Sequence, residues 1–250
     1  MDAAPVQVVV AQKPFRGQYP SRDGYGRIDA TSGSANRWGS VSATQVSPLY
    51  MGPVMDCDGE QCNCFENAWQ FRKVYPQLGH WDEAEQKPSE AWHQWRRAGY
   101  QKLKNGKGLR LPDDVAQLKK EWRQAPAHLK DTKRWTPKGC WWQGELLGYI
   151  EARKRFYVPE YARYVQQTEA FKEMQKLVQG GAKVMVLDFD GPPLAQYPRG
   201  MDVTLENMQR MLDEPAYPFG HGYVLACLLA GIDIPTLCGD TRKRLKVDPE

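Results

Sequence analysis

The stretch Cys62-Asn-Cys-Phe-Glu-Asn-Ala-Trp-Gln-Phe-Arg-Lys-Val-Tyr-Pro76 combines an apolar stripe with a strip of polar side chains. Phe65, Ala68 and Trp69 recur at the i, i+3 and i+4 spacing of a helix that lies on a core. Pro76 has no backbone N–H and restricts the residue before it, so it is expected to end the helix. The spacing predicts one helix over residues 62–76 with its apolar side buried.

A polar strip runs beside this apolar stripe. Glu66, Gln70 and Lys73 place an acid, an amide and a base next to one another on the predicted helix. If the strip faces inward, these groups could contact a ligand at the wall of a pocket. Asn63 and Glu66 also have the spacing of a capping box, in which both side chains satisfy backbone N–H groups at the start of a helix. From these residues alone, the cap is favoured over the pocket.

Length and composition indicate a packed globular protein. The chain has 250 residues, of which 41% are hydrophobic and 11% aromatic, and this supports one large domain with a substantial core. No apolar run approaches the roughly 18 residues of a membrane span. The apolar run at 6–11 is too short for a secretory signal and has no basic residue ahead of it. We therefore expect a cytoplasmic protein with no membrane partner, whose six cysteines are free thiols.

Basic and aromatic side chains are both unevenly distributed. The net charge is only +4. Lys and Arg nevertheless concentrate in a few segments, at residues 96–97, 102–110, 119–138, 153–155 and 242–246. Such clusters suit a nucleotide or nucleic acid, although a basic run is more often a solvated helix face. All but one of the nine Trp residues lie between Trp69 and Trp142; most are expected in the core, and one or two could stack on a base.

The pattern along the chain predicts an α+β fold, a mostly helical single domain with a small sheet. We expect residues 1–53 to form a loop-rich arm packed on the domain, residues 54–239 to form the main domain, and residues 240–250 to form a charged tail. Helices are predicted over residues 89–103, from Asp113 or Asp114 onward, and over 144–157, 159–178, 204–212 and 220–231. Strands are predicted over residues 6–10 and 183–191.

The second predicted strand ends in two aspartates. Val184-Met-Val-Leu-Asp-Phe-Asp-Gly191 should present Asp188 and Asp190 at the end of a buried strand. The run resembles the opening motif of haloacid dehalogenase-type phosphatases, which implies Asp188 as the nucleophile and Asp190 as the general acid. That motif normally opens a doubly wound domain, whereas here it comes late in the chain, so a phosphatase is a minor alternative. In the simpler interpretation, one aspartate caps a turn at the end of the strand.

Two further features carry candidate ligands. His221 lies between two glycines at the start of an apolar helix, where backbone N–H groups can bind phosphate, or where the histidine can cap its own helix. Cys57, Cys62 and Cys64 have the spacing C-x4-C-x-C, but no histidine follows at a zinc-finger spacing. We assign no metal to these cysteines.

Several motifs occur together in the order found in one family. They are Ser47-Pro-Leu-Tyr50, Phe65-Glu66-x-x-Trp69-Gln70-x-x-Lys73, Ile150-x-x-Ala-Arg-Lys-Arg-Phe156-x-x-Pro159, Val186-Leu-Asp188 and a Gly-rich start to the last apolar helix. This order resembles the NADAR family of YbiA-like N-glycosidases over about residues 45–232. The family's Trp-Gly after the aspartate is replaced here by Asp190-Gly-Pro-Pro193.

The resemblance implies a nucleotide-sized pocket and assigns roles to residues around it. Glu66 would be the principal carboxylate and Asp188 or Asp190 the second. Trp92 or Trp95 would stack on the substrate. Beside these implied roles, the residues themselves predict Gln70 and Lys73 of the polar strip and His221 at its helix start as substrate-binding groups. The basic turn with Arg153 and Arg155 would hold phosphate.

The resemblance also implies a reaction. We predict a hydrolase that cleaves an N-glycosidic bond, without a cofactor, in an ADP-ribosylated base or a phosphoribosyl compound. Such cleavage builds positive charge on the ribose, and a carboxylate can stabilise that charge or activate the attacking water. The alternative is an accessory protein that binds nucleic acid, or assists its modification, without hydrolase activity. Binding with a strong salt dependence and no turnover would favour this alternative.

Overall fold

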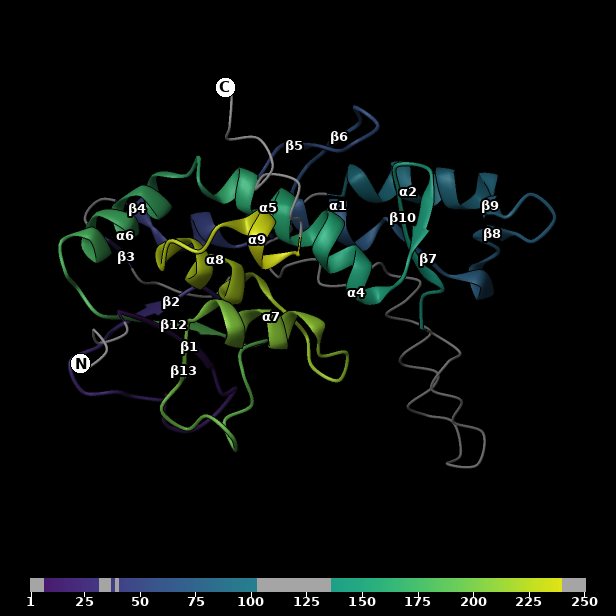
Figure 1. Cartoon of the computed structure of the whole chain (residues 1–250). Helices are drawn as coiled ribbons and strands as arrows, with labels where there is room; N and C mark the ends of the chain where they lie inside the picture. The colour runs from purple at the N-terminus through teal and green to yellow at the C-terminus, as the bar shows by residue number, and fades with distance from the viewer. Residues whose placement is uncertain (1–6, 32–36, 39–40, 103–135, 240–250) are drawn as a thin grey trace, which may run out of the picture. The chain divides into compact units, whose positions relative to one another are not determined.

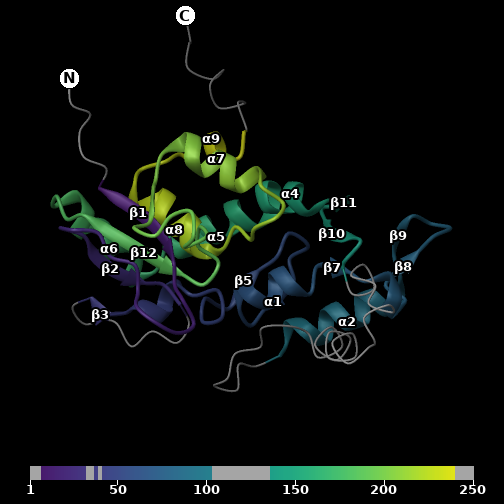
Figure 2. The same ribbon diagram turned by 90° about the horizontal axis from the view of Figure 1, so that it is seen from below.

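The computed structural model describes residues 7–31, 37–38, 41–102 and 136–239. Over these residues the chain forms helices and several small sheets, so the predicted α+β class is confirmed (Figure 1, and Figure 2 from below). The helix expected from Asp113 or Asp114 onward lies outside the described residues. None of the helices in the described part of the chain is both long and apolar enough to cross a membrane.

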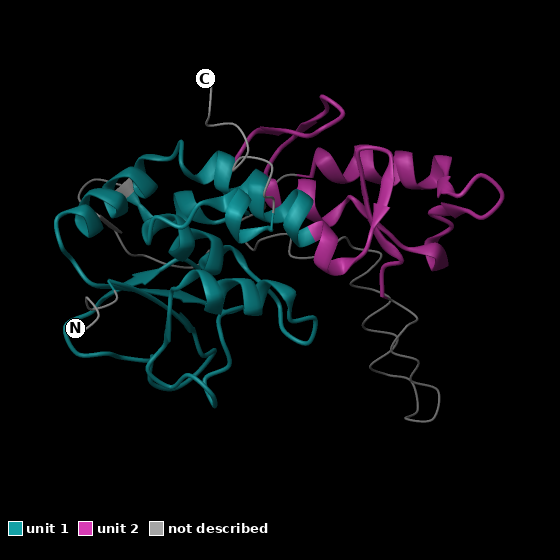
Figure 3. Ribbon diagram, viewed as in Figure 1, with its two compact units in different colours: residues 1–50, 153–250 teal, residues 51–152 magenta. Residues whose placement is uncertain are grey.

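The chain divides into two compact units, with one inserted in the other along the sequence (Figure 3). Unit 1 comprises residues 1–50 and 153–250, and unit 2 comprises residues 51–152. These boundaries differ from the predicted arm of residues 1–53 and main domain of residues 54–239. Residues 8–12 of the expected arm form an inner strand of a sheet in unit 1.

A four-stranded sheet organises unit 1. Its order is β13-β1-β12-β2, with bounds β1 Val8–Gln12, β2 Gly26–Asp29, β12 Val184–Asp188 and β13 Met201–Asp202. Strand β12 runs parallel to both β1 and β2, whereas β13 is antiparallel to β1. In the β1–β12 register, Val8 is opposite Val184 and Gln12 is opposite Asp188. The carboxyl ends of three parallel strands therefore meet at one edge.

The inner strands are apolar along their whole length, as expected of parallel strands covered on both faces. Every residue of β12 is buried, including Asp188 at its end. Helix α8, His221–Leu229, packs against both β1 and β12 and is itself almost entirely buried. The buried strand predicted over residues 183–191 is confirmed as β12, but it ends at Asp188 and Asp190 lies in the turn that follows. The buried helix predicted over residues 220–231 is confirmed as α8.

The other described elements of unit 1 are short. They are β3 Arg37–Trp38, β4 Val41–Ser42, the 3-10 helix η1 Ala43–Val46, the π-helical turn η4 Arg153–Tyr157, and the helices α5 Val158–Val165, α6 Glu169–Gln179, α7 Leu205–Asp213 and α9 Ile234–Leu237. The single helix predicted over residues 159–178 is wrong, because Thr168 starts a second helix there. Its hydroxyl accepts a hydrogen bond from the N–H of Phe171, 3.2 Å away.

Unit 2 is built from short strands and two principal helices. Its elements are β5 Val54–Met55, β6 Gln61–Cys62, α1 Phe65–Gln70, β7 Lys73–Val74, the 3-10 helix η2 Pro76–Leu78, β8 Trp81–Asp82, β9 Lys87–Pro88, α2 Glu90–Tyr100, β10 Gly139–Trp142, β11 Glu145–Leu147 and α4 Tyr149–Ala152. A three-stranded sheet has the order β11-β10-β7. The helix predicted over residues 144–157 is wrong at its start, because residues 145–147 pair with β10 as a strand.

The helix predicted over residues 62–76 is much shorter in the structure. Helix α1 has six residues and ends at Gln70, because the chain then pairs with β10 as β7. The capping box is also wrong. Cys64 is the N-cap without a side-chain hydrogen bond, and Asn63 donates its amide to the carbonyl oxygen of Gln101, 2.7 Å away.

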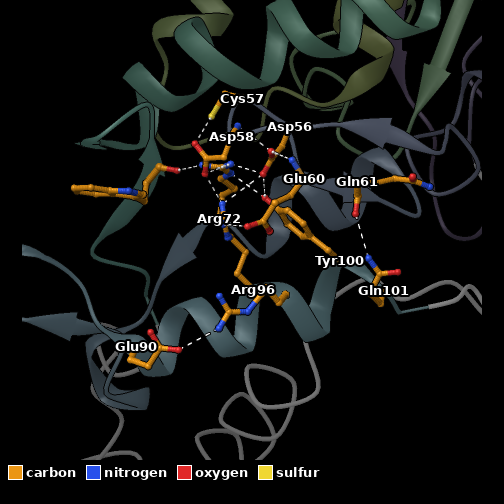
Figure 4. A network of polar contacts seen from close by, with 12 residues as sticks. Asp56, Cys57, Asp58, Glu60, Gln61, Arg72, Glu90, Arg96, Tyr100 and Gln101 are labelled. Atoms are coloured by element: carbon orange, nitrogen blue, oxygen red, sulfur yellow. Dashed lines mark hydrogen bonds and ion pairs between the residues drawn. The ribbon is translucent and has the colours of Figure 1, made fainter.

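A buried ion pair lies at the centre of unit 2 (Figure 4). The guanidinium of Arg72 bonds to the carboxylate of Asp56, and both side chains are 0% exposed. Arg72 Nε also donates to the hydroxyl of Tyr100 at 2.8 Å, and that hydroxyl donates to Asp56 Oδ2 at 2.8 Å. Buried charges are tolerated only when they are paired and hydrogen-bonded, and this cluster meets both conditions.

A second arginine extends this network toward the surface. Arg96 Nη1 lies 2.6 Å from Asp58 Oδ2, and Arg96 Nη2 lies 2.7 Å from Glu60 Oε1. Asp58 also accepts from Arg72 at 2.8 Å, so it joins the two arginines. The network therefore ties the turn between β5 and β6 to α2 and to the residue before β7.

We predict that Arg72→Met lowers the free energy of unfolding of unit 2 by about 3–5 kcal/mol, because it leaves Asp56 charged, buried and unpaired. Urea denaturation followed by tryptophan fluorescence measures the loss. Lys87→Met is the control, because Lys87 is 57% exposed and its pair with Glu85 lies at the surface, so its cost should stay within about 1 kcal/mol. Equal costs for the two variants would contradict a central role for the pair.

The network also predicts an acid-dependent loss of stability. Burial acts to raise the pKa of Asp58, but Arg72 and Arg96 outweigh it and lower that pKa below its ordinary value. Asp58 therefore stabilises the folded state above about pH 4, and this contribution disappears as the pH falls further and the carboxylate is protonated. Urea midpoints between pH 6 and pH 3 should fall more steeply in the wild type than in Asp58→Asn. Parallel curves would contradict this assignment.

Candidate functional site

Unit 2 contains a cavity of about 330 Å³ beside α1, β7, β10 and α4. This volume lies within the range of about 300–1,000 Å³ found for small-molecule sites. The side chains that define its chemistry are three aromatic residues, Trp69, Tyr75 and Tyr149, together with Lys73, Lys138 and Cys140. Mostly apolar walls with a few polar groups are typical of a ligand pocket. We call this cavity the unit 2 pocket.

The predicted polar strip leads to this pocket. Lys73 Nζ donates to Gln70 Oε1 at 2.7 Å, and Gln70 Nε2 donates to Glu66 Oε1 at 2.8 Å. The prediction that these three side chains lie together is confirmed. Lys73 Nζ also lies 5.0 Å from the centroid of the Trp69 ring, the geometry of a cation–π contact. The hydrogen bond from Lys73 to Gln70 thus holds the Lys73 ammonium over the Trp69 ring at the wall of the pocket.

A second ammonium group contributes to the same wall. Lys138 Nζ lies 4.4 Å from the centroid of the Trp81 ring and 3.3 Å from Glu83 Oε1. Lys138 is thus paired with Glu83 and lies over a ring outside the pocket lining, so Lys73 over Trp69 is the cation–aromatic pair of the pocket itself. A cation beside aromatic rings can hold an anionic group, while the rings provide faces for a flat ligand. The pocket is therefore suited to an aromatic ligand that carries negative charge.

The deeper wall of the pocket is electrically neutral. Burial raises the pKa of Cys140 to about 12. Burial, with a smaller contribution from Cys140, also raises the pKa of Tyr75 well above its ordinary value. A thiol that stays protonated is a poor nucleophile. Cys140 and Tyr75 therefore shape the pocket and leave the chemistry to other groups.

The two tryptophans predicted to stack on substrate have different positions. Trp92 is 0% exposed, and its indole N–H donates to the carbonyl oxygen of Lys73 at 3.1 Å. The predicted stacking role of Trp92 is wrong, because its ring is enclosed by the core and serves to position β7. Trp95 is half-buried and packs against Phe71 and His80, each with its ring centroid 4.6 Å away. The indole that lines the pocket is Trp69.

In unit 1, Asp188 occupies the start of helix α8. Asp188 is 2% exposed, and its Oδ2 accepts a hydrogen bond from the backbone N–H of Gly222 at 2.8 Å. His221 Nδ1 lies 3.3 Å from the same oxygen, and His221 Nε2 lies 2.8 Å from the carbonyl oxygen of Ala30. The approach is so close that a Cβ at position 222 would lie 2.4 Å from Asp188 Cβ.

This arrangement revises the predictions for His221 and the aspartates. The protein's own carboxylate occupies the helix start where phosphate was expected to bind. His221 does not cap its own helix, because Gly220 is the N-cap and the imidazole bonds to other segments. The enclosure of Asp188 also disfavours it as the exposed nucleophile of a phosphatase, while Asp190 is exposed. A joint role of Glu66 with Asp188 or Asp190 links the two units and stays a prediction.

In the basic turn Arg153–Tyr157, Arg153 has a structural role. Arg153 is 1% exposed and donates to the carbonyl oxygens of Leu212 at 3.3 Å, of Glu214 at 3.0 Å, and of Tyr217. The prediction that Arg153 holds a substrate phosphate is wrong, because its guanidinium is enclosed by these carbonyls at the end of α7 and in the segment that follows. Arg155 lies on the same π-helical turn with an exposed side chain, and its phosphate role stays a prediction.

Metal ligands do not cluster in the described part of the chain. No group of three His, Cys, Asp or Glu side chains there could hold a metal ion, and none of Cys57, Cys62 and Cys64 forms a disulfide there. The sequence did not single out Tyr75, Tyr149 or Lys138 as pocket residues. Trp69 was assigned only to the buried stripe. The sequence interpretation put Lys73 on the same helix as Trp69, but the helix ends at Gln70 and Lys73 lies in β7, so helical spacing did not reveal the contact between them.

Comparisons of the chain with protein-family models, with curated proteins and with solved structures find no match.

We predict that Cys140 resists alkylation in the folded protein. With a pKa of about 12, its thiolate fraction at pH 8 is of order a thousandfold below that of an ordinary cysteine. Iodoacetamide labelling at pH 8, followed by peptide mass spectrometry, should modify the half-buried Cys57 and Cys238 well before Cys140. Labelling in urea provides the control in which all cysteines react. Rapid labelling of Cys140 in the native protein would show a reactive thiol in the pocket instead.

Proposed function

We propose that the unit 2 pocket binds the base of a nucleotide-type substrate and that the protein hydrolyses its N-glycosidic bond. The observation that supports binding is the ammonium of Lys73 held over the ring of Trp69 at the wall of an aromatic pocket. A base can stack on an aromatic ring, and a phosphate can pair with an ammonium group.

Different residues of the pocket would stack on the base and pair with the phosphate. Trp69 and Tyr149 offer aromatic surface, and Tyr149 is 49% exposed at the opening, whereas Tyr75 is buried deeper. Lys73 offers positive charge over Trp69, and Lys138, which pairs with Glu83, lines the same pocket. The favoured substrates are therefore an ADP-ribosylated base or a phosphoribosyl compound, both of which join a flat heterocycle to phosphate through ribose.

Glu66 is the proposed catalytic carboxylate. It lies one helical turn before Trp69 and Gln70, and Gln70 links it by hydrogen bonds to Lys73. With the base in the pocket, a ribose extending along α1 would approach this carboxylate. Glu66 would then stabilise the positive charge that develops on the ribose or deprotonate the attacking water. The resemblance to NADAR N-glycosidases supports the same residue for this role.

Gln70 is a positioning residue in this scheme. Its amide is the acceptor for Lys73 and the donor to Glu66, so one side chain fixes both the phosphate-binding group and the carboxylate. Gln70 is itself buried, which limits its alternative rotamers. Such preorganisation reduces the entropy cost of binding and orienting the substrate.

We predict that Glu66→Gln reduces turnover about 10²–10⁴-fold, the usual contribution of a general acid–base group, while substrate binding remains. Lys73→Met and Trp69→Ala should instead weaken binding, because they remove the phosphate partner and the stacking surface. The assay incubates the full chain with ADP-ribosylated nucleic acid and with free phosphoribosyl compounds. Mass spectrometry then identifies released base or ribose product, and calorimetry measures binding.

The matched control is Lys87→Met, which removes an exposed lysine of unit 2 that lies outside the pocket lining. Unchanged turnover in Glu66→Gln would exclude that carboxylate. Binding that survives both Lys73→Met and Trp69→Ala would exclude the pocket. Binding without turnover of any tested substrate would instead favour the nucleic-acid accessory protein.

A further inference from the structure

Unit 1 displays an aromatic platform on its surface. Phe15 is 80% exposed, far more than any other large apolar residue in the described part of the chain. Its ring stacks on that of Phe189 with a centroid distance of 4.6 Å and an interplanar angle of 10°. One face of Phe15 is therefore supported by another ring, and the opposite face is presented to solvent.

This platform stands at a position where open sheets commonly bind ligands. Phe15 follows β1, and Phe189 follows β12, so both leave the carboxyl ends of adjacent parallel strands. Ligands of α/β sheets bind in the crevice outside these ends. The parallel pairing of two distant segments thus brings the two rings together.

The base of the platform is held rigidly. Lys13 Nζ lies 2.6 Å from Asp29 Oδ2 and 2.8 Å from Thr31 Oγ1, which fixes the chain after β1 to the end of β2. The same ammonium lies 5.2 Å from the centroid of the Phe189 ring. Gln12 Nε2 donates to the carbonyl oxygen of Phe189 at 3.3 Å. A preorganised surface of this kind loses little conformational entropy when it binds.

A cationic groove adjoins the platform. It has a volume of about 500 Å³ and is lined by Phe15, Tyr19, Arg16 and Arg27, among others, with no carboxylate in the lining. Both arginines are exposed, and within the described residues neither guanidinium forms an ion pair. Two uncompensated guanidinium groups beside an exposed ring attract an anion that also carries a flat surface.

We propose that this surface, the Phe15 groove, binds single-stranded nucleic acid. An unpaired base stacks on the outer face of Phe15, and the phosphates on either side of it pair with Arg16 and Arg27. Stacking platforms combined with positive grooves are the general means of binding single strands. A duplex is a poorer ligand, because its base faces are already covered by neighbouring bases.

The structure favours a strand over a free nucleotide. Arg16 lies in the loop after β1 and Arg27 on β2, so the two guanidinium groups come from separate segments along one groove. An open groove with spaced charges follows a backbone, whereas a mononucleotide site encloses its ligand. The proposal concerns unit 1 alone and does not depend on hydrolysis in the unit 2 pocket.

The test is fluorescence anisotropy of the full chain with fluorescein-labelled single strands of about 12 nucleotides. Phe15→Ala should weaken binding at least about fivefold, since a base–aromatic stack contributes about 1–3 kcal/mol. Phe15→Tyr should retain binding, because it keeps the ring. Arg16→Ala combined with Arg27→Ala should reduce the slope of log K against log salt by about 1.4, as expected for two lost phosphate contacts.

The matched control combines Lys172→Ala with Lys176→Ala. It also removes two positive charges from unit 1, but on α6, where both lysines pair with glutamates, and it should leave binding unchanged. Circular dichroism checks that each variant is folded. An unlabelled duplex of the same sequence should compete much less effectively than the unlabelled single strand.

Several results would overturn the proposal. One is the absence of binding by the wild type, and another is an equal loss in the groove variants and the control, which would indicate only non-specific charge attraction. Unchanged binding in Phe15→Ala would exclude the stacking platform. A mononucleotide could also displace the labelled strand as well as an unlabelled strand does at the same total nucleotide concentration. That result would assign the groove to a free nucleotide instead.

Discussion

The parallel pairing of β1 with β12 determines which residues meet at the carboxyl edge of the sheet in unit 1. It joins segments from opposite ends of the sequence and places Gln12 opposite Asp188. Because Asp188 is then buried as a carboxylate, it requires donors, and the start of α8 supplies the N–H of Gly222. The same pairing sets Phe15 and Phe189 side by side. The β1–β12 register thus accounts both for the buried carboxyl group of Asp188 and for the stacked pair of rings at Phe15 and Phe189.

Unit 2 depends in a similar way on the burial of Arg72. Its pairing with Asp56 fixes the chain directly after α1, and its carbonyl oxygen accepts from the N–H of Trp141 at 2.9 Å. The helix therefore ends early and the next residue, Lys73, enters a strand. Successive residues of an extended chain face opposite sides. Arg72 accordingly points into the buried network while Lys73 lines the pocket, so two neighbouring cations lie in different surroundings.

The sequence predicted features that depend on local periodicity. The buried strand ending at Asp188, the helix Leu205–Asp213 and the grouping of Glu66 with Gln70 and Lys73 all follow from spacing within a few residues. Features that depend on distant partners were missed or wrong. Nothing near Arg153 in sequence reveals that carbonyls beyond position 211 enclose it, and a periodic stripe cannot separate the buried Trp92 from the accessible Trp69.

The two proposed sites differ in enclosure, and this difference suits different ligands. The unit 2 pocket has a buried wall at Cys140 and Tyr75 and a volume of about 330 Å³. The Phe15 groove lies open with two separated guanidinium groups, so its ligand can continue in either direction along a backbone. A base bound in the pocket gains selectivity from shape, whereas a strand on the groove gains affinity from stacking and counterion release with little dependence on sequence.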